Sequence, residues 1–289
     1  MAHKTEKSAP PRLRLFANLW TLWDHPGAGN EWTLEEKVVA IRDAGFDGFA
    51  WILNRRHGVL GRRHGLFTIG FISSANPAEF RTLIRHAIDG GARRINAQLG
   101  DHDTPVDKAV RMAIRIIGEC GRLDIPCDIE IHRDTCTETP EKAYAIAAGY
   151  RKATGQLLPI SWDFSHISVV KHLAPPYWER LLVNPRLIQH SCQFHFRPFN
   201  GHHCQVPVTD GKGALSTELR QWLPFLEKTL ETWLAVNQNG RELFACPEMG
   251  PVRGGYNLAQ LPGSWEDARI LRGIIEKAWE KALASYQFG

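Results

Sequence analysis

The sequence IPCDIEIH, residues 125–132, is the stretch that decides the fold class, because its last six residues alternate between apolar and polar side chains. Asp128, Glu130 and His132 alternate with apolar residues, so a β-strand here has one polar and one apolar face. We expect the apolar face to pack against helices and the polar face to point into a barrel. Buried charge is costly unless it is compensated, so Glu130 at the carboxyl end of the strand predicts a binding site.

Three later segments also place a polar side chain at the carboxyl end of an expected strand. Asp163 lies in ISWDFSH, His195 in CQFHFR and Glu248 in FACPEMG. The carboxyl ends of parallel strands in successive βα units meet at one end of the sheet. These three residues and Glu130 should therefore converge. Taken singly, His195 fits a core histidine and Asp163 a turn residue, but their shared position in four strands favours a common site.

Short apolar segments alternate with longer segments of helical periodicity along the chain. We expect strands over residues 13–20, 46–53, 66–72, 92–99, 125–132, 157–164, 187–196 and 242–249. Thr33 and Glu36 predict a capping box after the first strand, whereas the second and third strands leave room for only a short or missing helix. The pattern predicts the α/β class, a single (β/α)8 TIM barrel over residues 13–289, behind a disordered leader over residues 1–12.

Composition narrows the function classes. The chain has 289 residues, with 43% hydrophobic and 23% charged residues, as in ordinary globular proteins. Its net charge of +4 gives no case for nucleic acid, and no apolar segment is long enough to cross a membrane. The six cysteines form no CxxC pair and are expected to be reduced thiols of a cytoplasmic protein. A homo-oligomer is expected only by analogy with other barrels.

The four converging residues predict a metal site. Three carboxylates and one imidazole suit one divalent cation, with Mn²⁺ preferred and Mg²⁺, Co²⁺ and Zn²⁺ left open. Such an ion would bind a carbonyl oxygen and a neighbouring hydroxyl, which acidifies the adjacent C–H bond. Glu130 and Glu248 would then act from opposite faces of the substrate, one taking a proton from carbon and the other returning one. Trp20, at the end of the first strand, is expected either to stack on a sugar or to pack in the core.

On these residues the sequence resembles the xylose isomerase-like barrel superfamily, which contains sugar phosphate isomerases and epimerases and the endonuclease IV type. The shared motifs are Glu on strand five, Asp-x-x-His after strand six, His on strand seven and Glu on strand eight. The resemblance implies that Glu130, Asp163, His195 and Glu248 bind the metal, that the two Glu exchange the proton, and that His166, Arg197 and His132 lie near a small carbohydrate-like substrate. The segment after strand seven, RPFNGHHCQVPVTDGKG, is longer than in the family's epimerases and leaves the substrate open.

Three other functions stay open. A lyase or dehydratase acting on a keto-sugar or 3-keto-glycoside would use the same metal and base. An endonuclease IV-like zinc phosphodiesterase would need further ligands, for which His57, His64, His102, His202 and His203 are candidates. A non-catalytic barrel would need none of this chemistry. The repeated RRHG of residues 55–58 and 62–65 is expected at the barrel mouth, as an ion-paired loop in preference to a phosphate site.

Overall fold

Strand β1 (Arg12–Asn18) pairs in parallel with β2 on one side and with β8 on the other, which closes a barrel of eight parallel strands in sequence order. The computed structural model describes residues 9–256 and 261–286. The other strands are β2 Gly48–Trp51, β3 Phe67–Ser74, β4 Arg94–Leu99, β5 Cys127–Glu130, β6 Ile160–Trp162, β7 Gln193–His195 and β8 Glu242–Cys246. The predicted (β/α)8 barrel is thereby confirmed.

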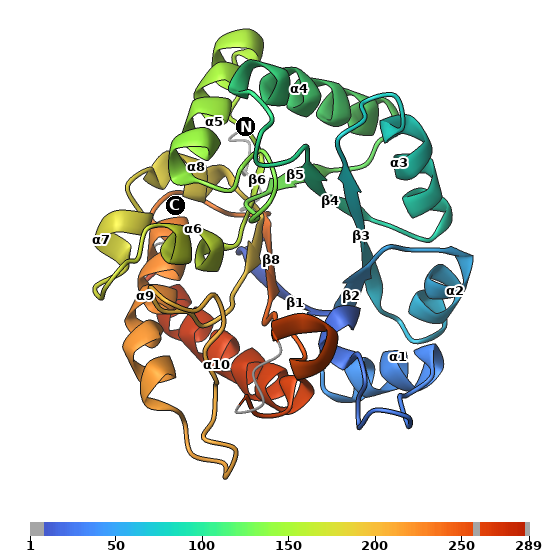
Figure 1. The fold of residues 1–289 in the computed structure, drawn as a ribbon, viewed down its shortest axis with the longest axis vertical. Coiled ribbons are helices and arrows are strands. Elements are labelled where there is room, and N and C mark those ends of the chain that lie inside the picture. Colours follow the sequence, from blue (N-terminus) through green and yellow to red (C-terminus); the bar gives the residue numbers. More distant parts are fainter. Residues whose placement is uncertain (1–8, 257–260, 287–289) are drawn as a thin grey trace, which may run out of the picture.

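Helices surround the strands, as Figure 1 shows in a view along the barrel. The α-helices are α1 Leu34–Asp43, α2 Arg55–Arg63, α3 Phe80–Asp89, α4 Val106–Arg122, α5 Pro140–Thr154, α6 Phe164–Val170, α7 Trp178–Leu181, α8 Pro185–His190, α9 Thr217–Leu234 and α10 Ser264–Ala284. A 3-10 helix, η1 (Leu19–Leu22), follows β1, and a π-helix, η2 (Val252–Tyr256), follows β8. No helix in the described part of the chain is long and apolar enough to cross a membrane.

Several predicted boundaries hold and others are wrong. The capping box of Thr33 and Glu36 is present at the start of α1, and a nine-residue α2 connects β2 to β3. The predicted strand over residues 187–196 is wrong in its first part, since α8 occupies it and β7 has only three residues. The reason is Asn184, whose side chain caps α8 just before a proline at the first helical position.

Both ends of the chain depart from the expected boundaries. Residues 1–8 of the predicted leader lie outside the described residues, and β1 begins at Arg12, the last residue assigned to that leader. The first strand also ends early, because the side chain of Asn18 accepts a hydrogen bond from Trp20 N at 3.0 Å and starts η1.

The placement of the RRHG repeat is corrected in part. Helix α2 begins just after the carboxyl end of β2 and runs back toward the amino-terminal end of the barrel. Only its first half, residues 55–58, therefore lies near the expected mouth. The second half, residues 62–65, ends beside Phe67, the first residue of β3, at the opposite end of the barrel.

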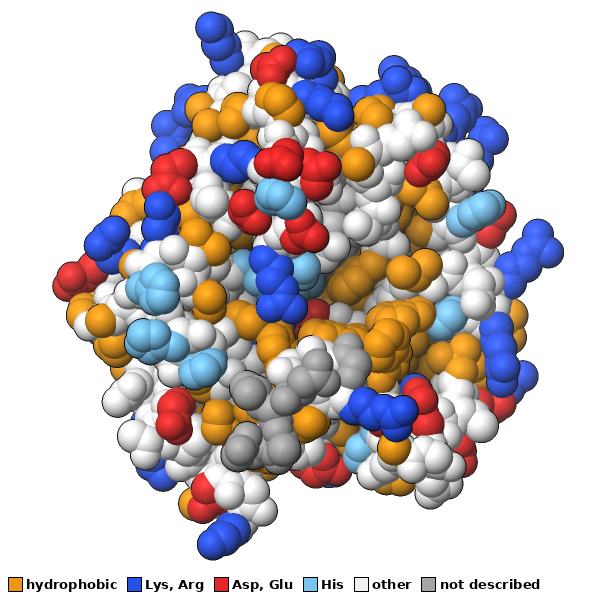
Figure 2. All heavy atoms as spheres, viewed as in Figure 1, with side chains coloured by type: hydrophobic (Ala, Val, Ile, Leu, Met, Phe, Trp, Pro, Cys, Tyr) orange, Lys and Arg blue, Asp and Glu red, His pale blue; other side chains and the backbone are white. Residues whose placement is uncertain are grey.

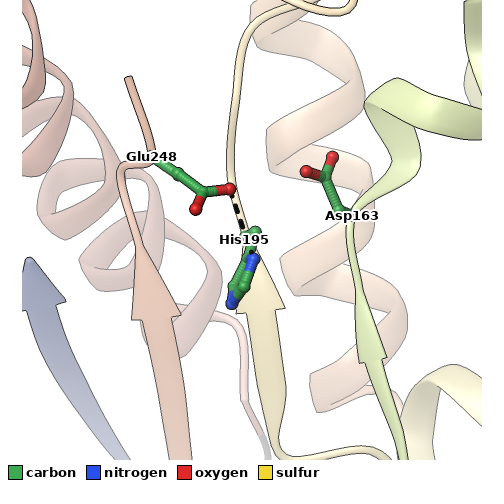
Figure 3. Close-up of side chains that lie close together, drawn as sticks. All are labelled: Asp163, His195 and Glu248. Atoms are coloured by element: carbon green, nitrogen blue, oxygen red, sulfur yellow. Dashed lines mark ion pairs between the residues drawn. The ribbon is translucent and has the colours of Figure 1, made fainter. Parts of the chain in front are cut away.

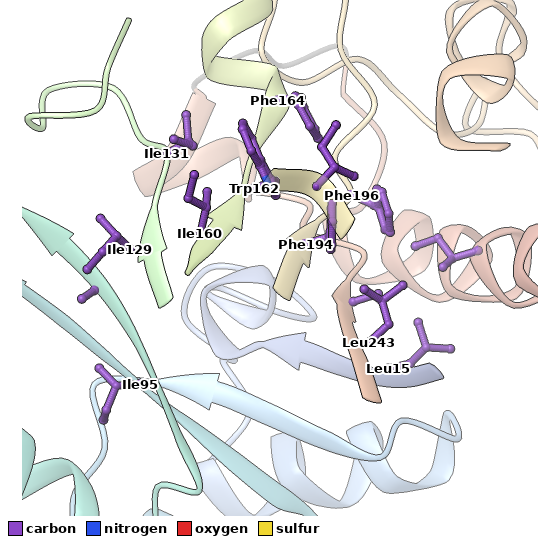
Figure 4. Packing of buried hydrophobic residues seen from close by; sticks show 14 of the residues in the cluster. Leu15, Ile95, Ile129, Ile131, Ile160, Trp162, Phe164, Phe194, Phe196 and Leu243 are labelled. Carbon is purple, nitrogen blue, oxygen red and sulfur yellow. The ribbon is translucent and has the colours of Figure 1, made fainter. Parts of the chain in front are cut away.

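The outer core lies between strands and helices, and Figure 4 shows part of it. Trp162 stacks on Phe164 with ring centroids 4.8 Å apart, and Phe164 meets Phe225 of α9 edge-on at 5.2 Å. Each such ring contributes about 1.5–3 kcal/mol by leaving water. Ile129 and Phe194 belong to the same cluster, so the apolar strand faces pack outward as the alternation predicted.

A second apolar layer fills the middle of the barrel interior. It consists of Phe16, Ala50, Ile69 and Cys246, with Phe67, Phe71 and Phe244 packed around it. The four central side chains have no exposed surface. This layer, which we call the interior plug, lies in the same barrel interior as the buried amides of Asn96 and Gln193, which bond to each other at 2.8 Å.

Candidate active site

The four predicted ligands lie together at the carboxyl end of the barrel. Glu130 ends β5, His195 ends β7, Asp163 follows β6 directly, and Glu248 lies two residues beyond β8. All four side chains are buried. Figure 3 shows the carboxylates of Asp163 and Glu248 on either side of His195. Strand topology therefore brings residues from four segments of the chain to one point.

His195 lies between two carboxylates. Its Nδ1 is 3.2 Å from Glu130 Oε1 and 3.3 Å from Glu248 Oε2, yet it is not aligned with either oxygen for a hydrogen bond. The imidazole ring is fixed by the interior plug, stacking on Phe71 at 5.9 Å and meeting Phe16 edge-on at 6.0 Å. His195 Nδ1 and the two carboxylate oxygens therefore form a group of close donor atoms that suits a cation.

Arg197 reaches the same carboxylates from the other side. Its Nη2 donates to Asp163 Oδ2 at 2.7 Å and also to Glu248 Oε2. The guanidinium is buried, 5.9 Å from the ring of Trp20 and 5.6 Å from that of Tyr256. Arg197 is thus a counter-ion of two predicted metal ligands as well as a candidate substrate contact.

Amide side chains support both Glu residues, and the sequence reasoning missed them. Glu130 Oε2 accepts hydrogen bonds from Asn96 Nδ2 at 2.6 Å and Gln98 Nε2 at 2.8 Å. Glu248 Oε1 accepts one from Asn18 Nδ2 at 2.5 Å. The signal was available, because Asn96 and Gln98 alternate with apolar residues in ARRINAQL just as the polar residues of β5 do.

Asp163 has both roles that were considered for it. Its Oδ1 caps α6 by accepting a hydrogen bond from Ser165 N at 3.0 Å, while its Oδ2 faces Arg197. His166, one turn along α6, holds Nε2 3.4 Å from the same Oδ2 without a hydrogen bond. His132 lies against it, with ring centroids 4.3 Å apart. The two histidines predicted to lie near the substrate are therefore adjacent to the cluster.

Trp20 and Tyr256 flank the cluster at the rim. Their ring centroids are 5.8 Å apart, and the ring of Trp20 packs so closely on Gly250 that a Cβ there would lie 2.4 Å from it. Figure 2 shows this end of the molecule hollowed near its centre, with hydrophobic side chains on one side of the hollow and histidine and basic side chains on the other. Such a mixed lining suits a ligand with both C–H faces and hydroxyl groups.

The charges of the cluster shift one another's pKa. Burial raises the pKa of Glu248, yet the charges of Arg197 and His195 outweigh it and hold that pKa well below its usual range. Burial also raises the pKa of Glu130, but the charge of His195 keeps it below its usual value. For Asp163, burial prevails over the charge of Arg197, and its pKa is raised.

The two histidines have opposite shifts. Burial lowers the pKa of His195, but the charges of Glu248 and Glu130 prevail and raise it to about 10. Burial and the charges of His132 and Arg197 lower the pKa of His166 well below 6.5, so its imidazole is neutral. In the protein alone, a guanidinium and an imidazolium therefore lie among the three carboxylates. Together these two groups bring the charge of one divalent ion.

The donor set fits a divalent metal. Asp163, His195 and Glu248 each offer a ligand atom, and these atoms lie within 4.8 Å of one another. Neighbouring ligand atoms of an octahedral ion with bonds of about 2.1 Å are roughly 3.0 Å apart, close to the separation between His195 and Glu248. Glu130 is outside this group of three but touches His195. A metal ion at these atoms would require His195 to lose its proton, and it would share the carboxylates of Asp163 and Glu248 with Arg197.

The histidines considered for a zinc cluster are spread over the molecule. His57 bonds to Asn54 in the first turn of α2, and His64 follows the end of that helix. His102 pairs with Asp134 at 2.7 Å, and His202 lies against His172. The group of Asp163, His195 and Glu248 is the one possible metal site in residues 9–256 and 261–286, which does not favour the trinuclear alternative.

Comparisons with known proteins place the fold. No family model matches the sequence, and no curated protein matches it. Among solved structures, the chain is similar to a D-tagatose 3-epimerase-like protein, with a TM-score of 0.55 and 14% identity over 93% of this chain and 99% of that one. It is also similar to a xylose isomerase-like TIM barrel protein from Mycobacterium smegmatis in complex with magnesium, with a TM-score of 0.54 and 15% identity over 96% of this chain and 100% of that one.

A third similar structure is D-allulose 3-epimerase from Methylomonas sp. in complex with D-allulose, with a TM-score of 0.54 and 13% identity over 96% of this chain and 100% of that one. At these identities the similarity shows the fold, a xylose isomerase-like TIM barrel, as the sequence resemblance predicted.

Proposed function

We propose that this protein is a divalent-metal-dependent isomerase or epimerase of a sugar or a related cyclitol or keto-sugar, with Glu130 and Glu248 as its acid–base pair. The observation that carries the proposal is the position of His195 Nδ1, which lies 3.2 and 3.3 Å from carboxylate oxygens of these two residues. Two similar barrels were solved with magnesium and with D-allulose, which agrees with this chemistry.

Glu130, Asp163, His195 and Glu248 would hold the ion, for which Mn²⁺ is the first candidate. A bound ion would polarise a carbonyl group and lower the cost of negative charge next to it. Both Glu130 and Glu248 have lowered pKa values and are ionised at neutral pH, so either can act as the base, and the other acts as the acid only after it has taken up a proton from solvent. One takes the proton from the carbon beside the carbonyl, and the other, once protonated, returns a proton.

Other side chains orient and enclose the substrate. His166, neutral and with an unpaired Nε2, is placed to hydrogen-bond a substrate hydroxyl, and His132 lies beside it. Arg197, released from a carboxylate, would donate to a substrate oxygen. Trp20 offers an aromatic face at the rim. These four residues remain proposed substrate contacts.

The proposal is tested by proton exchange. The protein, loaded with Mn²⁺, is incubated with a panel of ketoses and keto-glycosides in D₂O, and NMR follows deuterium entry at the carbon beside the carbonyl. We expect deuterium entry together with a new stereoisomer. Glu248→Gln and Glu130→Gln should each reduce the exchange rate by about 10²-fold or more. Glu280→Gln, an exposed change on α10, should leave the rate unchanged.

The same spectra separate the alternatives. Loss of water or of an aglycone would assign the protein to the lyases, because proton abstraction is shared and only the next step differs. The non-catalytic alternative would be supported if Mn²⁺ binds but no substrate exchanges a proton, and if neither Glu substitution changes the Mn²⁺ binding. Cleavage of abasic DNA that requires three metal ions per chain would contradict the isomerase assignment.

A further inference from the structure

A cavity of about 570 Å³ lies at the amino-terminal end of the barrel, opposite to the candidate active site. Small-molecule pockets in proteins have volumes of about 300–1,000 Å³. The wall is formed by the first residues of several strands and the loops before them, and it includes His64 and Gly65 from the second RRHG sequence. Five arginines line it: Arg14, Arg42, Arg93, Arg94 and Arg241.

Carboxylates neutralise three of these arginines. Arg14 donates to Glu242 Oε1 at 2.7 Å and lies 3.4 Å from Asp47 Oδ1. The other two ion pairs are Arg42 with Asp43 and Arg94 with Asp128. Five guanidinium groups therefore face four carboxylates, and the wall keeps an excess of positive charge.

The excess lies on Arg93 and Arg241. Within the described residues, the side chain of Arg93 has no hydrogen bond or ion pair. In the same part of the chain Arg241 has no carboxylate partner: its Nη1 donates to Gln189 O at 2.6 Å and to Gln238 Oε1, and its Nη2 donates to His190 O at 2.6 Å and to Cys192 Sγ at 3.0 Å. These contacts orient the guanidinium without neutralising its charge. The Arg93 guanidinium is therefore available to donate hydrogen bonds to an oxyanion, and the unneutralised charge of Arg241 attracts the same anion.

The floor of the cavity is aromatic. Phe67 and Phe244 meet at right angles with centroids 5.4 Å apart, and both are only partly buried because they face the cavity. The guanidinium of Arg94 lies 4.8 Å from the centroid of Phe244. Partly exposed rings under a cationic rim favour a ligand that covers the rings with an apolar plane and carries its negative charge toward the rim.

We propose that this cavity binds a small molecule made of a planar ring and a multivalent oxyanion, either a phosphate or a cluster of carboxylates. The ring covers Phe67 and Phe244, and the oxyanion pairs with Arg93 and Arg241. None of the four proposed metal ligands lines this cavity, so binding here requires neither metal nor a functional Glu248. Its success or failure is therefore independent of the proposed isomerase chemistry.

The test is isothermal titration calorimetry on the full-length protein in the presence of EDTA. The probes are AMP and benzene-1,3,5-tricarboxylate as ring-bearing anions, adenosine as a ring without the anion, and inorganic phosphate as an anion without the ring. The variant Arg93→Glu reverses an exposed charge at the rim that has no structural partner. The matched control is Arg115→Glu, the same change at an exposed position of α4 away from the cavity.

We expect saturable binding of AMP or of the tricarboxylate, which identifies the oxyanion as phosphate or carboxylate. Affinity should fall by tenfold or more in Arg93→Glu, stay unchanged in Arg115→Glu and weaken as salt is raised. If adenosine binds as tightly as AMP, the proposed role of the anion is wrong. If inorganic phosphate binds as tightly as AMP, the proposed role of the ring is wrong. Absence of binding for every probe, or equal losses in the two variants, would overturn the site itself.

Discussion

Replacing Arg197 with Met tests whether the guanidinium and the metal compete for the same carboxylates. Arg197 Nη2 binds Asp163 Oδ2 at 2.7 Å and also binds Glu248, and the pair is buried. Methionine keeps much of the volume of the arginine stem but removes the charge and both hydrogen bonds. In the metal-free protein, two carboxylates then lose their partner inside the barrel.

The magnitude follows from these contacts. A buried hydrogen bond between charged groups contributes about 1.5–3 kcal/mol, and breaking a buried ion pair costs about 3–5 kcal/mol. We therefore expect metal-free Arg197→Met to unfold with about 3–5 kcal/mol less free energy than the unmodified protein. Part of that deficit should return when Mn²⁺ binds, because the ion no longer has to displace a guanidinium. A gain of about 1.4–2.8 kcal/mol corresponds to 10- to 100-fold tighter Mn²⁺ binding.

The assays are urea unfolding with EDTA and calorimetric titration with Mn²⁺. Arg197→Lys retains a charge and should lie between the two proteins in metal affinity, whereas Arg115→Met on the exposed side of α4 should match the unmodified protein. Turnover should fall in Arg197→Met although the metal binds more tightly, since the substrate loses a donor. Equal or weaker Mn²⁺ binding in Arg197→Met would refute the competition.

Three further predictions concern stability, pH and basicity. Trp162→Ala removes a ring stacked at 4.8 Å and its hydrogen bond to Ser191, and should cost about 3–5 kcal/mol in urea unfolding, against less than about 1 kcal/mol for the exposed Trp23→Ala. In the metal-free protein the pKa of His195 is raised from 6.5 to about 10. The contribution of protonated His195 to the free energy of unfolding is therefore complete below pH 6.5 and is lost as the pH rises toward 10. In urea unfolding, His195→Asn should lack this decline in the free energy of unfolding. Asn18→Ala removes a donor to the carboxylate of Glu248, so the pKa of that group should rise and the acidic limb of the kcat/KM profile should move to higher pH; an unmoved limb contradicts this.

The alternation of polar and apolar residues made the fold and the meeting of the four side chains predictable. In IPCDIEIH the polar face could point only inward, because Ile129 and its neighbours needed the helices outside. Strand order then determined which ends meet. The start of β7 was not predicted, because Asn184 before a proline starts a helix and this signal outweighs the apolar residues that follow it.

What the sequence did not predict are contacts between distant elements. The bonds of Arg197 to Asp163 and Glu248 join residues 34 and 51 positions apart and depend on where three strands end. The position of residues 62–65 depended on the direction of α2, which reverses the chain between β2 and β3. These contacts arise because the closed barrel brings distant segments of the chain together, which the local periodicity of the sequence does not encode.

The interior plug also bears on how small molecules reach the candidate active site. Phe16, Ile69 and Cys246 have no exposed surface and pack below the ring of His195. Under the proposed function, substrate and product would therefore enter and leave at the carboxyl end of the barrel. Product release from that end would then set an upper limit on the turnover rate.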